Sequence, residues 1–391
     1  MINIRVAVRI RPFSKREILE NDEIVVQKEG KSVLVTNPKI FEKQEGKTKK
    51  RTNKFVVDFC YDSKDPQTSN QEAVYNEIGS EVLDSLLGGY NSCVLAYGHS
   101  ASGKTYTMMG TLEDPGLIPR LCQGLFDKKD EKTKCQFHVT VSFFEIYNEK
   151  VRDLLVFDDD RSEHNLSNFS LRVREHPKLG PYVQNLSQHG VTCKSEVLEL
   201  LKIGNKRRST ATTENNTYSS RSHSVFTLIF KENDKKFEIE KCSKVHLVDL
   251  AGSERASKVQ NKTRLKEGAN INKSLVALGN VISSLAENYK IGENSKDYSI
   301  LKSWQPFVPY RESILTWLLK DTLGGNSKTI MIATVSPASS CLNETINTLR
   351  YAKRTRRIMN QPVVNEDPKT KIIRELRKEI SKLKSLLSVM L

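Results

Sequence analysis

One segment of eight residues, 98–105, constrains the fold more than any other; it reads GHSASGKT. It matches GxxxxGK[ST], in which the glycines let the backbone turn its N–H groups toward a phosphate, while Lys104 reaches the terminal oxygens and the Thr105 hydroxyl ligates Mg²⁺. An apolar run from Cys93 to Tyr97 precedes the segment and predicts a strand, and a helix is predicted from Thr105. The positive end of that helix dipole then faces the phosphate. The segment therefore predicts a nucleotide-phosphate site at the end of a strand.

Further apolar runs indicate an α/β domain built on a central sheet. They predict strands at Ile4 to Ile10, Phe137 to Ile146, Val225 to Phe230, Val245 to Leu250 and Thr329 to Val335. Between the strands, Val197, Leu200 and Leu201 have helical spacing, and Gly204 is predicted to end that helix. Three polar runs, 43–54, 158–168 and 289–308, are predicted to be solvated surface loops.

Composition excludes some classes of protein and leaves others open. No run approaches the roughly 18 apolar residues of a membrane span, and arginines interrupt the apolar positions at the N-terminus, so neither membrane insertion nor a signal peptide is expected. The seven cysteines are scattered without a CxxC pair, which predicts no disulfide framework and no zinc site, and a reducing cytoplasmic compartment. The net charge of +15 favours an acidic partner: nucleic acid, anionic lipid or an acidic protein surface.

A second motif supplies a carboxylate and a backbone sensor for a nucleotide. The apolar run from Val245 ends in Asp249, which is placed to hold a metal-bound water, and Gly252 can bring its N–H close to a γ-phosphate. Taken alone, DxxG after an apolar run is mostly a turn. Together with residues 98–105, it indicates a P-loop enzyme.

A third motif is rich in hydroxyl groups. Residues 216–223 read NTYSSRSH, and such a run by itself is most simply a flexible loop. Beside the other two motifs, its hydroxyls are expected to complete the Mg²⁺ shell and to hold the attacking water. Arg221 is expected to pair with Glu254, just beyond Gly252.

The C-terminal part of the chain has a different character. Pro362 and Pro368 block a continuous helix there. The residues beyond them repeat apolar side chains at alternating spacings of 3 and 4, as in an a/d seam: Ile373, Leu376, Ile380, Leu383, Leu387 and Met390. Two interpretations stay open, a short coiled coil that forms a homodimer through 369–391 and an amphipathic helix that docks on its own domain.

These motifs together resemble the kinesin superfamily over about residues 3–391. The resemblance is carried by RIRP at 9–12, the segment 97–110, FEIYNE at 144–149, residues 216–223 and DLAGSER at 249–255. Residues 264–275, 310–321 and 365–377 look most like the class-three, vesicle-transporting kinesins. The resemblance implies the P-loop NTPase kinesin motor fold, with a central mixed sheet flanked by helices on both faces. It also implies a motor domain at 1–355, a neck linker at 356–368 and a neck helix at 369–391.

The resemblance implies ATP or ADP and Mg²⁺ as cofactors and assigns the pocket residue by residue. Tyr106 is expected to stack on the adenine, and Arg208 leads into the first switch. The nucleotide-binding set is Arg9, Arg11, Pro12, Gly98, His99, Ser100, Ala101, Ser102, Gly103, Lys104, Thr105 and Tyr106. The metal-binding set is Thr105, Ser220 and Asp249, and the catalytic set is Ser219, Ser220, Arg221, Gly252 and Glu254.

Two segments depart from the family pattern. Kinesin P-loops usually read GQTxSGKT, whereas His99, Ser100 and Ala101 occupy the variable positions here. In class-three kinesins a dense lysine run lies where this chain has 289–308, which contains three separated lysines.

The function implied is a microtubule-stimulated ATPase motor that moves toward the plus end, in the cytoplasm and on microtubules. Track contacts are expected at Lys258, Lys262, Arg264, Lys266, Lys273 and Arg311. A tail beyond this sequence is expected to bind cargo. The alternative is a kinesin-like microtubule-binding ATPase that regulates filaments without processive transport.

Two other classes are disfavoured by the motifs. A nucleic-acid binder would need a groove-reading motif or interleaved aromatic and basic residues, and the sequence has neither. A P-loop GTPase would need an NKxD-type guanine reader, which is not found at a suitable place.

Overall fold

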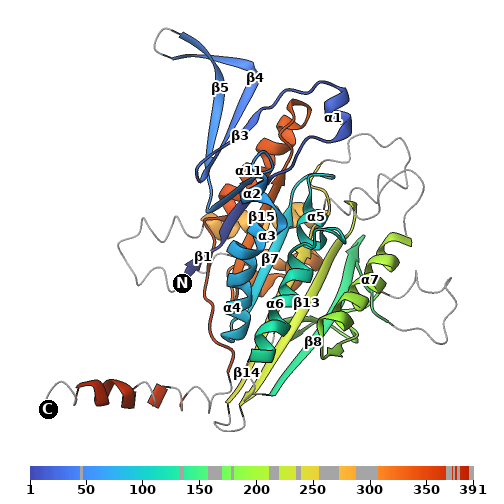
Figure 1. Ribbon diagram of the computed structural model, residues 1–391, viewed down its shortest axis with the longest axis vertical. Coiled ribbons are helices and arrows are strands. Elements are labelled where there is room, and N and C mark those ends of the chain that lie inside the picture. Colours follow the sequence, from blue (N-terminus) through green and yellow to red (C-terminus); the bar gives the residue numbers. More distant parts are fainter. Residues whose placement is uncertain are drawn as a thin grey trace.

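The computed structural model describes residues 1–44, 47–131, 136–156, 170–177, 180–210, 220–234, 239–254, 273–287, 307–366, 372, 375–376 and 379–386. A large mixed sheet forms the centre of this described part (Figure 1). Its strands lie in the order β12–β8–β13–β14–β7–β15–β2–β6, and β9 pairs with β8. Their bounds are β2 Arg5–Ile10, β6 Phe59–Asp62, β7 Ser92–Tyr97, β8 Gln136–Tyr147, β9 Lys150–Asp153, β12 His189–Val191, β13 His223–Asp234, β14 Ile239–Asp249 and β15 Lys328–Val335.

The sheet is parallel on one side and antiparallel on the other. The pairs β14–β7, β7–β15, β15–β2 and β2–β6 are parallel, whereas β12, β8 and β13 join the sheet in antiparallel pairs. All six residues of β7 are buried, as expected for a parallel strand covered on both faces. The six strands predicted from apolar runs are all confirmed.

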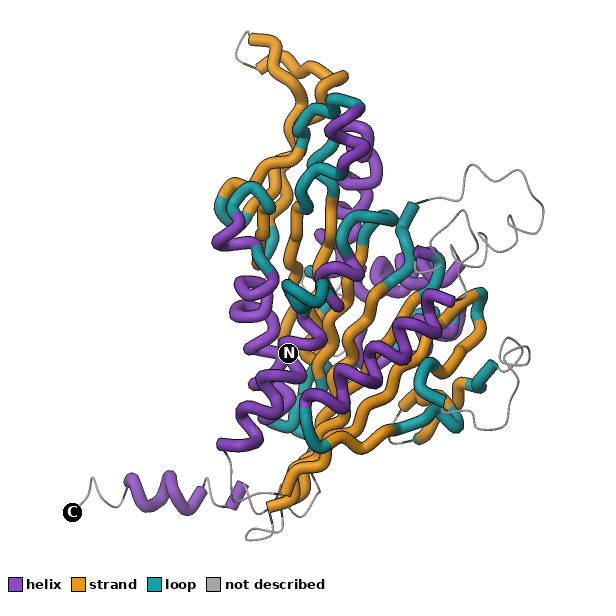
Figure 2. The backbone as a smooth tube through the Cα atoms, turned by 45° about the vertical axis from the view of Figure 1, so that its right-hand side comes forward, coloured by secondary structure: helices purple, strands orange, loops and turns teal. Residues whose placement is uncertain are grey.

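Helices cover both faces of the sheet (Figures 1 and 2). On one face lie α3 (Gln71–Val74), a π-helical turn (Tyr75–Gly79), α4 (Ser80–Leu87), α6 (Leu117–Glu131) and α7 (Lys194–Thr210), and their apolar side chains share one core with Phe143 and Phe226. On the other face lie a helix at 273–287, α10 (Ile314–Leu318) and α11 (Leu342–Thr355), in a second core. The predicted fold class is therefore confirmed.

Short elements complete the described part. The helices are α1 (Lys15–Leu19), α2 (Pro66–Ser69) and α5 (Lys104–Met109), with 3₁₀ turns at Tyr310–Glu312, Lys320–Thr322 and Ser339–Cys341. Short strands outside the central sheet include β1 (Ile2–Asn3), β10 (Val173–His176), β11 (Gly180–Val183) and β16 (Met359–Asn360). None of the helices in the described ranges is long and apolar enough to cross a membrane.

The prediction that Gly204 ends a helix is wrong. The helix α7 continues through Gly204 to Thr210. A Cβ atom at Gly204 would lie 2.3 Å from Cδ1 of Phe143, on β8. The glycine therefore allows α7 to pack closely on the sheet, which is a tertiary requirement that helical spacing does not reveal.

The predicted loop at 43–54 is also wrong, because most of it is a β-hairpin. Strands β4 (Ser32–Gln44) and β5 (Lys47–Val56) pair with each other, and β3 (Val26–Glu29) completes a small sheet that projects from the body (Figure 1). Most residues of this run are polar or basic, so the sequence lacks the alternation of apolar and polar residues from which a strand is usually recognised. The run 158–168, and 289–308 apart from its last two residues, lie outside the described residues.

The segment after α11 lies along the body of the molecule. β16 pairs with β1 near the N-terminus. The amide of Asn360 is fully buried, and its Nδ2 donates to the carbonyl oxygens of Thr322 (2.9 Å) and Ser327 (2.7 Å). Farther along, the N–H of Asn365 donates to the carbonyl oxygen of Gly89 at 2.8 Å. The segment 357–366 is therefore docked.

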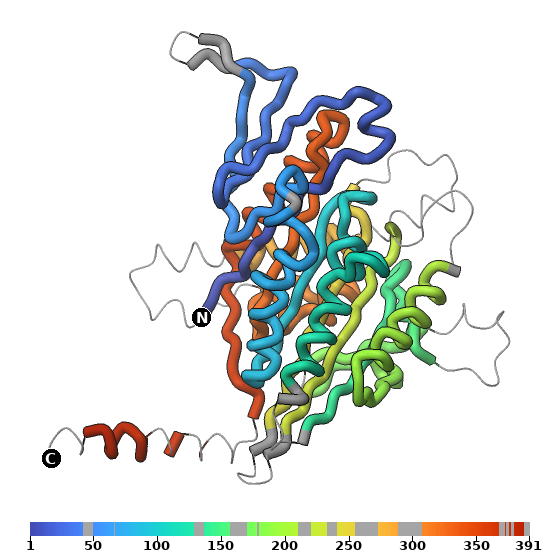
Figure 3. Tube along the Cα trace, viewed as in Figure 1, coloured from blue at the N-terminus to red at the C-terminus, as the bar shows by residue number. Residues whose placement is uncertain are grey.

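The C-terminal helix points away from the body (Figure 3). Residues 379–386 are helical, and the side chains of Leu376, Ile380 and Leu383 are 53%, 52% and 55% exposed. Among the described residues, this apolar face is therefore not buried against the body of the molecule, and the interpretation of a helix docked on its own domain is not supported there. Ile373, Leu387 and Met390 lie outside the described residues.

Candidate nucleotide site

The register of the central sheet brings the three sequence motifs together. β14 is parallel to β7, with Asp249 opposite Ala96, and the 98–105 loop follows β7 directly. β13 is antiparallel to β14, with Ser224 opposite Asp249, so the motif that precedes β13 reaches the same edge. Segments 98–105, 220–223 and 249–254 therefore converge where the strands β7 and β14 end, the usual ligand position in such sheets.

The 98–105 loop folds back on its own lysine. Gly103 has φ 104°, in the left-handed region that favours glycine, immediately before α5. Nζ of Lys104 donates to the carbonyl oxygens of Gly98 (2.9 Å) and His99 (2.8 Å). Burial lowers the pKa of Lys104, and the charges of Asp249 and Glu254 oppose that shift. The loop thus holds a buried ammonium group at its centre.

Thr105 and Asp249 form the part of the site that fits a metal ion. Oγ1 of Thr105 donates to Oδ2 of Asp249 at 2.7 Å, and Nη1 of Arg208 donates to the same oxygen at 2.9 Å. The other carboxylate oxygen, Oδ1, is buried and has no hydrogen-bond partner. A hydroxyl beside a free carboxylate oxygen is a donor set that a hard cation such as Mg²⁺ prefers. These residues therefore fit the ion that the sequence implies.

The backbone of Gly252 joins the second and third motifs. Its N–H donates to the carbonyl oxygen of Ser220 at 2.8 Å, and the next N–H, of Ser253, donates to the carbonyl oxygen of Gly98 at 3.1 Å. A Cβ atom at Gly252 would lie 2.3 Å from Oγ of Ser100, so a larger residue here would displace the side chains of Ser100 and Glu254. Ser219 lies outside the described residues.

Glu254 contacts the P-loop rather than Arg221. The N–H of Ser100 donates to Oε2 of Glu254 at 2.8 Å, and the Ser100 hydroxyl donates to Oε1. Burial alone would raise the pKa of Glu254, but the hydrogen bonds from Ser100 hold it below its ordinary value. The expected pairing of Arg221 with Glu254 is not formed in this structure and stays a prediction for the ATP-bound protein.

Arg9 lies against the ring expected to hold the adenine. Its guanidinium is buried, donates to Gln71 Oε1 (2.8 Å) and Thr107 Oγ1 (3.0 Å), and sits 5.1 Å from the centre of the Tyr106 ring. Tyr106 as a residue is 42% exposed, so its side chain can be reached by a base. Gln71 also donates to the carbonyl oxygen of Tyr106 at 2.6 Å, and no sequence motif identified it.

Arg11 is held beside the P-loop by a residue that the motifs also missed. Its Nε donates to the carbonyl oxygen of Ala101 at 2.9 Å, and its Nη1 lies 2.6 Å from Oε2 of Glu17. Glu17 also forms a capping box with Ser14 at the start of α1. The S-x-x-E spacing of this pair is the sequence signal from which Glu17 could have been found. Pro12 is exposed and follows Arg11 directly in the sequence. Ser102, in the P-loop, is buried, and its Oγ forms a hydrogen bond with Oγ1 of Thr334 at 2.6 Å.

His99 is one of the residues that depart from the family P-loop. Its side chain is buried, and its Nε2 has no hydrogen-bond partner. Burial lowers the pKa of His99, and the nearby charges of Lys104 and Arg11 act in the same direction. The imidazole is therefore neutral at pH 7.

Two of the expected track contacts can be placed. Lys273 is exposed at the start of the 273–287 helix, and Arg311 is exposed and forms an ion pair of 2.5 Å with Glu175. The other four, Lys258, Lys262, Arg264 and Lys266, lie outside the described residues.

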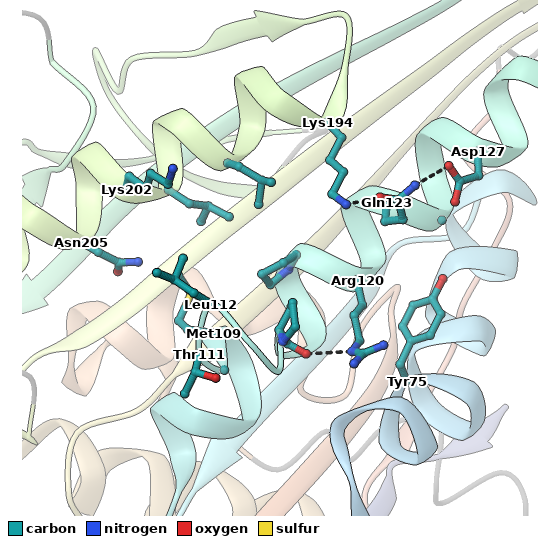
Figure 4. A pocket seen from close by; sticks show the side chains of 16 residues that line it. Tyr75, Met109, Thr111, Leu112, Arg120, Gln123, Asp127, Lys194, Lys202 and Asn205 are labelled. Carbon is teal, nitrogen blue, oxygen red and sulfur yellow. Dashed lines mark hydrogen bonds between the residues drawn. The ribbon is translucent and has the colours of Figure 1, made fainter.

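A separate cavity of about 740 Å³ lies between α6 and α7 (Figure 4). Lys194 donates to Gln123, which in turn donates to Asp127 at 2.5 Å, and these side chains lie along one side of the cavity. None of the expected nucleotide-binding residues lines it. The candidate site is therefore the sheet edge and not this cavity.

Comparison with known proteins decides the family. The family model described as "Kinesin motor domain" matches residues 9–358. The chain belongs to the kinesin family. This kinesin is 50% identical to human "Kinesin-like protein KIF16B" over 398 residues, which covers 99% of the chain and 30% of that protein. It is 46% identical to human "Kinesin-like protein KIF1B" over 398 residues, which covers 98% of the chain and 21% of that protein.

Solved structures agree with the fold of this kinesin. A microtubule complex of KIF14 with AMP-PNP superposes with a TM-score of 0.82 at 45% identity, and covers 96% of this chain and 99% of that one. A microtubule complex of KIF14 with ADP gives a TM-score of 0.75 at 45% identity, and covers 93% and 98%. The predicted kinesin resemblance, class three included, is confirmed. The chain spans less than a third of the length of the curated relatives described above.

Proposed function

We propose that this kinesin is an ATPase stimulated by microtubules that uses ATP hydrolysis to move toward the plus end. One observation carries the proposal: the Thr105 hydroxyl, the half-free Asp249 carboxylate and the Gly252 N–H meet at one sheet edge, although they come from distant parts of the chain. Such an edge binds a nucleotide phosphate and senses whether its terminal phosphate is present.

The chain's own residues have separate tasks in this proposal. Lys104 leaves its two carbonyl partners to bind the β- and γ-phosphate oxygens, and Tyr106 stacks on the adenine. Thr105, Ser220 and Asp249 would hold Mg²⁺, which would supply positive charge to offset that of the phosphates. Arg221 and Glu254 then close over the nucleotide, and Glu254, released from Ser100, relays the proton of the attacking water.

The docked segment 357–366 is proposed to transmit the change at the nucleotide site to the C-terminal part of the chain. In the proposed cycle, it docks along the body when ATP binds and is released after hydrolysis, because the ATP and ADP states offer different contacts to the switch segments. Asn360 and Asn365 hold it through buried or partly buried amide hydrogen bonds. The segment corresponds to the neck linker proposed at 356–368, between the motor domain 1–355 and the neck helix 369–391.

Microtubules are the proposed partner. The relatives solved with AMP-PNP and with ADP are complexes with a microtubule, and a net charge of +15 complements an acidic polymer surface. The proposed contacts are Lys258, Lys262, Arg264, Lys266, Lys273 and Arg311. The protein is accordingly proposed to act in the cytoplasm on microtubules, to dimerise through 369–391, and to carry cargo through a tail outside this sequence.

A gliding assay on polarity-marked microtubules tests activity and direction together. The expected result is ATP-dependent gliding with the minus end leading, together with an ATP turnover that microtubules raise at least ten-fold. Binding to filaments without movement would overturn the motor proposal and favour the alternative, a microtubule-binding ATPase that regulates filaments.

A further inference from the structure

A buried histidine lies between the nucleotide site and the helix 273–287, and none of the roles proposed above uses it. His223 is the first residue of β13, and its side chain is 2% exposed. Its Nδ1 accepts a hydrogen bond from the N–H of Ala251 at 3.0 Å. Its Nε2 lies 2.8 Å from Oγ of Ser274, in the first turn of the helix.

The two hydrogen bonds fix the tautomer of the ring. A backbone N–H only donates, so Nδ1 of His223 carries no proton and the ring proton lies on Nε2. Nε2 therefore donates to the hydroxyl of Ser274. Burial lowers the pKa of His223 to about 3, and the positive charges of Arg208 and Lys104 add to that shift. The ring stays neutral at physiological pH, and both hydrogen bonds persist.

The two partners of His223 belong to segments with different tasks. Ala251 is the residue immediately before Gly252, whose N–H is the proposed sensor of the terminal phosphate. Ser274 lies in the first turn of the helix 273–287, which buries Leu278 and Val281 in the same core as Leu349 of α11. The ring therefore forms a direct hydrogen-bonded connection between the phosphate sensor and this helix.

The helix continues the connection to the docked segment. Oγ of Ser283 accepts a hydrogen bond from Nη1 of Arg354 at 3.3 Å, near the end of α11. Ile358, three residues beyond the end of α11 at Thr355, is buried in the same core as the helix 273–287. A displacement of Ser274 would thus reach the start of the linker through packed contacts.

We propose that His223 is a positioning residue that couples the phosphate-sensing backbone at Ala251–Gly252 to the helix 273–287 through Ser274. The inference rests on the proposed function for its biological meaning. The mechanical claim is that movement of Gly252 toward a γ-phosphate moves the imidazole of His223, and that the imidazole then moves the first turn of the helix 273–287.

Removal of one hydroxyl tests the connection. Ser274→Ala deletes the acceptor of the Nε2–H bond and leaves the ring in place. Ser243→Ala is the matched control, because Ser243 is also buried (1% exposed) and its Oγ donates to the carbonyl oxygen of Leu86 at 2.6 Å, away from the connection. Ser274→Thr restores a hydroxyl and serves as the rescue.

The measurement is hydrogen–deuterium exchange of the full chain over 275–287, with Mg²⁺ and either AMP-PNP or ADP. The wild type is expected to show a nucleotide-dependent difference in this helix. Loss of one net hydrogen bond changes an equilibrium roughly five-fold, so Ser274→Ala should reduce that difference about five-fold. Ser243→Ala and Ser274→Thr should retain at least half of it.

Two substitutions of the histidine separate its two contacts. His223→Asn keeps an acceptor near the Nδ1 position, and His223→Gln keeps a donor near the Nε2 position. Each retains only one hydrogen bond, so both are expected to lose the nucleotide-dependent difference. If either substitution prevents folding, the comparison of Ser274→Ala with Ser243→Ala decides by itself.

The proposal is overturned if Ser274→Ala retains the wild-type difference, if Ser243→Ala loses it equally, or if the wild type shows none. The ATP turnover of the wild type with and without microtubules is measured separately. Absence of stimulation would refute the proposed function, whereas a nucleotide-dependent exchange difference that Ser274→Ala reduces about five-fold would still support the coupling through His223.

Discussion

Ser100 and Glu254 are 154 positions apart in the sequence, and the backbone N–H of Ser100 donates to Oε2 of Glu254 at 2.8 Å while the Ser100 hydroxyl donates to Oε1. Ser100, one of the three P-loop residues at the variable positions, therefore holds the carboxylate assigned to proton relay. We infer that binding of ATP exchanges this contact for the pairing of Glu254 with Arg221.

Replacement of Glu254 tests its assignment. Glu254→Ala should lower microtubule-stimulated ATP turnover at least 100-fold, the usual contribution of a positioned acid or base, while the protein still binds ATP. The measurement is steady-state turnover beside binding of a fluorescent ATP analogue. Glu344→Ala, at a partly buried position in the first turn of α11 and outside the nucleotide site, is the control and should keep wild-type turnover. Normal turnover by Glu254→Ala would refute the proton relay.

The buried pair of Arg208 and Asp249 predicts an order of stability among three proteins. Asp249→Asn removes the charge that Arg208 contacts at 2.9 Å and should lower the free energy of unfolding by about 3 kcal/mol, because it leaves a buried cation without its partner. Thr105→Ala removes one hydrogen bond to the same carboxylate and should cost about 1 kcal/mol. Urea denaturation measures both, and a smaller effect for Asp249→Asn than for Thr105→Ala would contradict the assigned geometry.

Asn360 should determine whether the linker stays docked. Its buried side chain donates to Thr322 and Ser327 and accepts from the N–H of Gly324 at 2.8 Å, so Asn360→Ala leaves several buried backbone groups without partners. Amides 361–366 should then exchange at least ten-fold faster with deuterium, since undocking frees the bonded N–H groups. Asn347→Ala, on exposed α11 surface, should leave that exchange unchanged. Equal exchange in both variants would mean that other contacts hold the linker.

The lowered pKa of His223 predicts how stability changes with pH. The folded protein holds this ring neutral until about pH 3, whereas the unfolded chain protonates it near pH 6.5, so the unfolded state binds the extra proton between these values. This group's contribution is fully present above about pH 6.5 and is lost as the pH falls toward 3. Between pH 4 and 6, the unfolding free energy of the wild type should rise about 1.4 kcal/mol per pH unit more steeply than that of His223→Gln. Parallel pH profiles would contradict the buried neutral ring.

The exposed apolar face of the C-terminal helix predicts self-association. Leu376, Ile380 and Leu383 remain about half exposed, and three heptads are near the lower limit for a coiled coil, so a weak dimer is expected. Sedimentation over a concentration series should show a monomer that converts to a dimer. Leu383→Glu should abolish the dimer, and Lys382→Glu on the outer face should retain it. A monomer at every concentration would refute the two-stranded interpretation.

The fold class, and the three segments that meet at the candidate site, could be predicted from the sequence by itself. Each of the three segments has a local signature, because phosphate and metal binding need particular residues at fixed spacing. The GxxxxGK[ST] segment follows one apolar run, DxxG follows another, and the hydroxyl-rich segment precedes a third. The central strands could also be predicted from the sequence, because a strand buried on both faces has a continuous run of apolar residues.

Only the tertiary structure decided which side chains contact one another. Gly204 allows close packing against Phe143, and Glu254 contacts Ser100 rather than Arg221. His223 contacts Ala251 and Ser274, which lie in two other segments of the chain. The hairpin of β4 and β5 likewise becomes evident only when its strands pair. These features depend on distances between residues far apart in the chain, and such distances follow from sheet register and helix packing, which no local pattern of residues encodes.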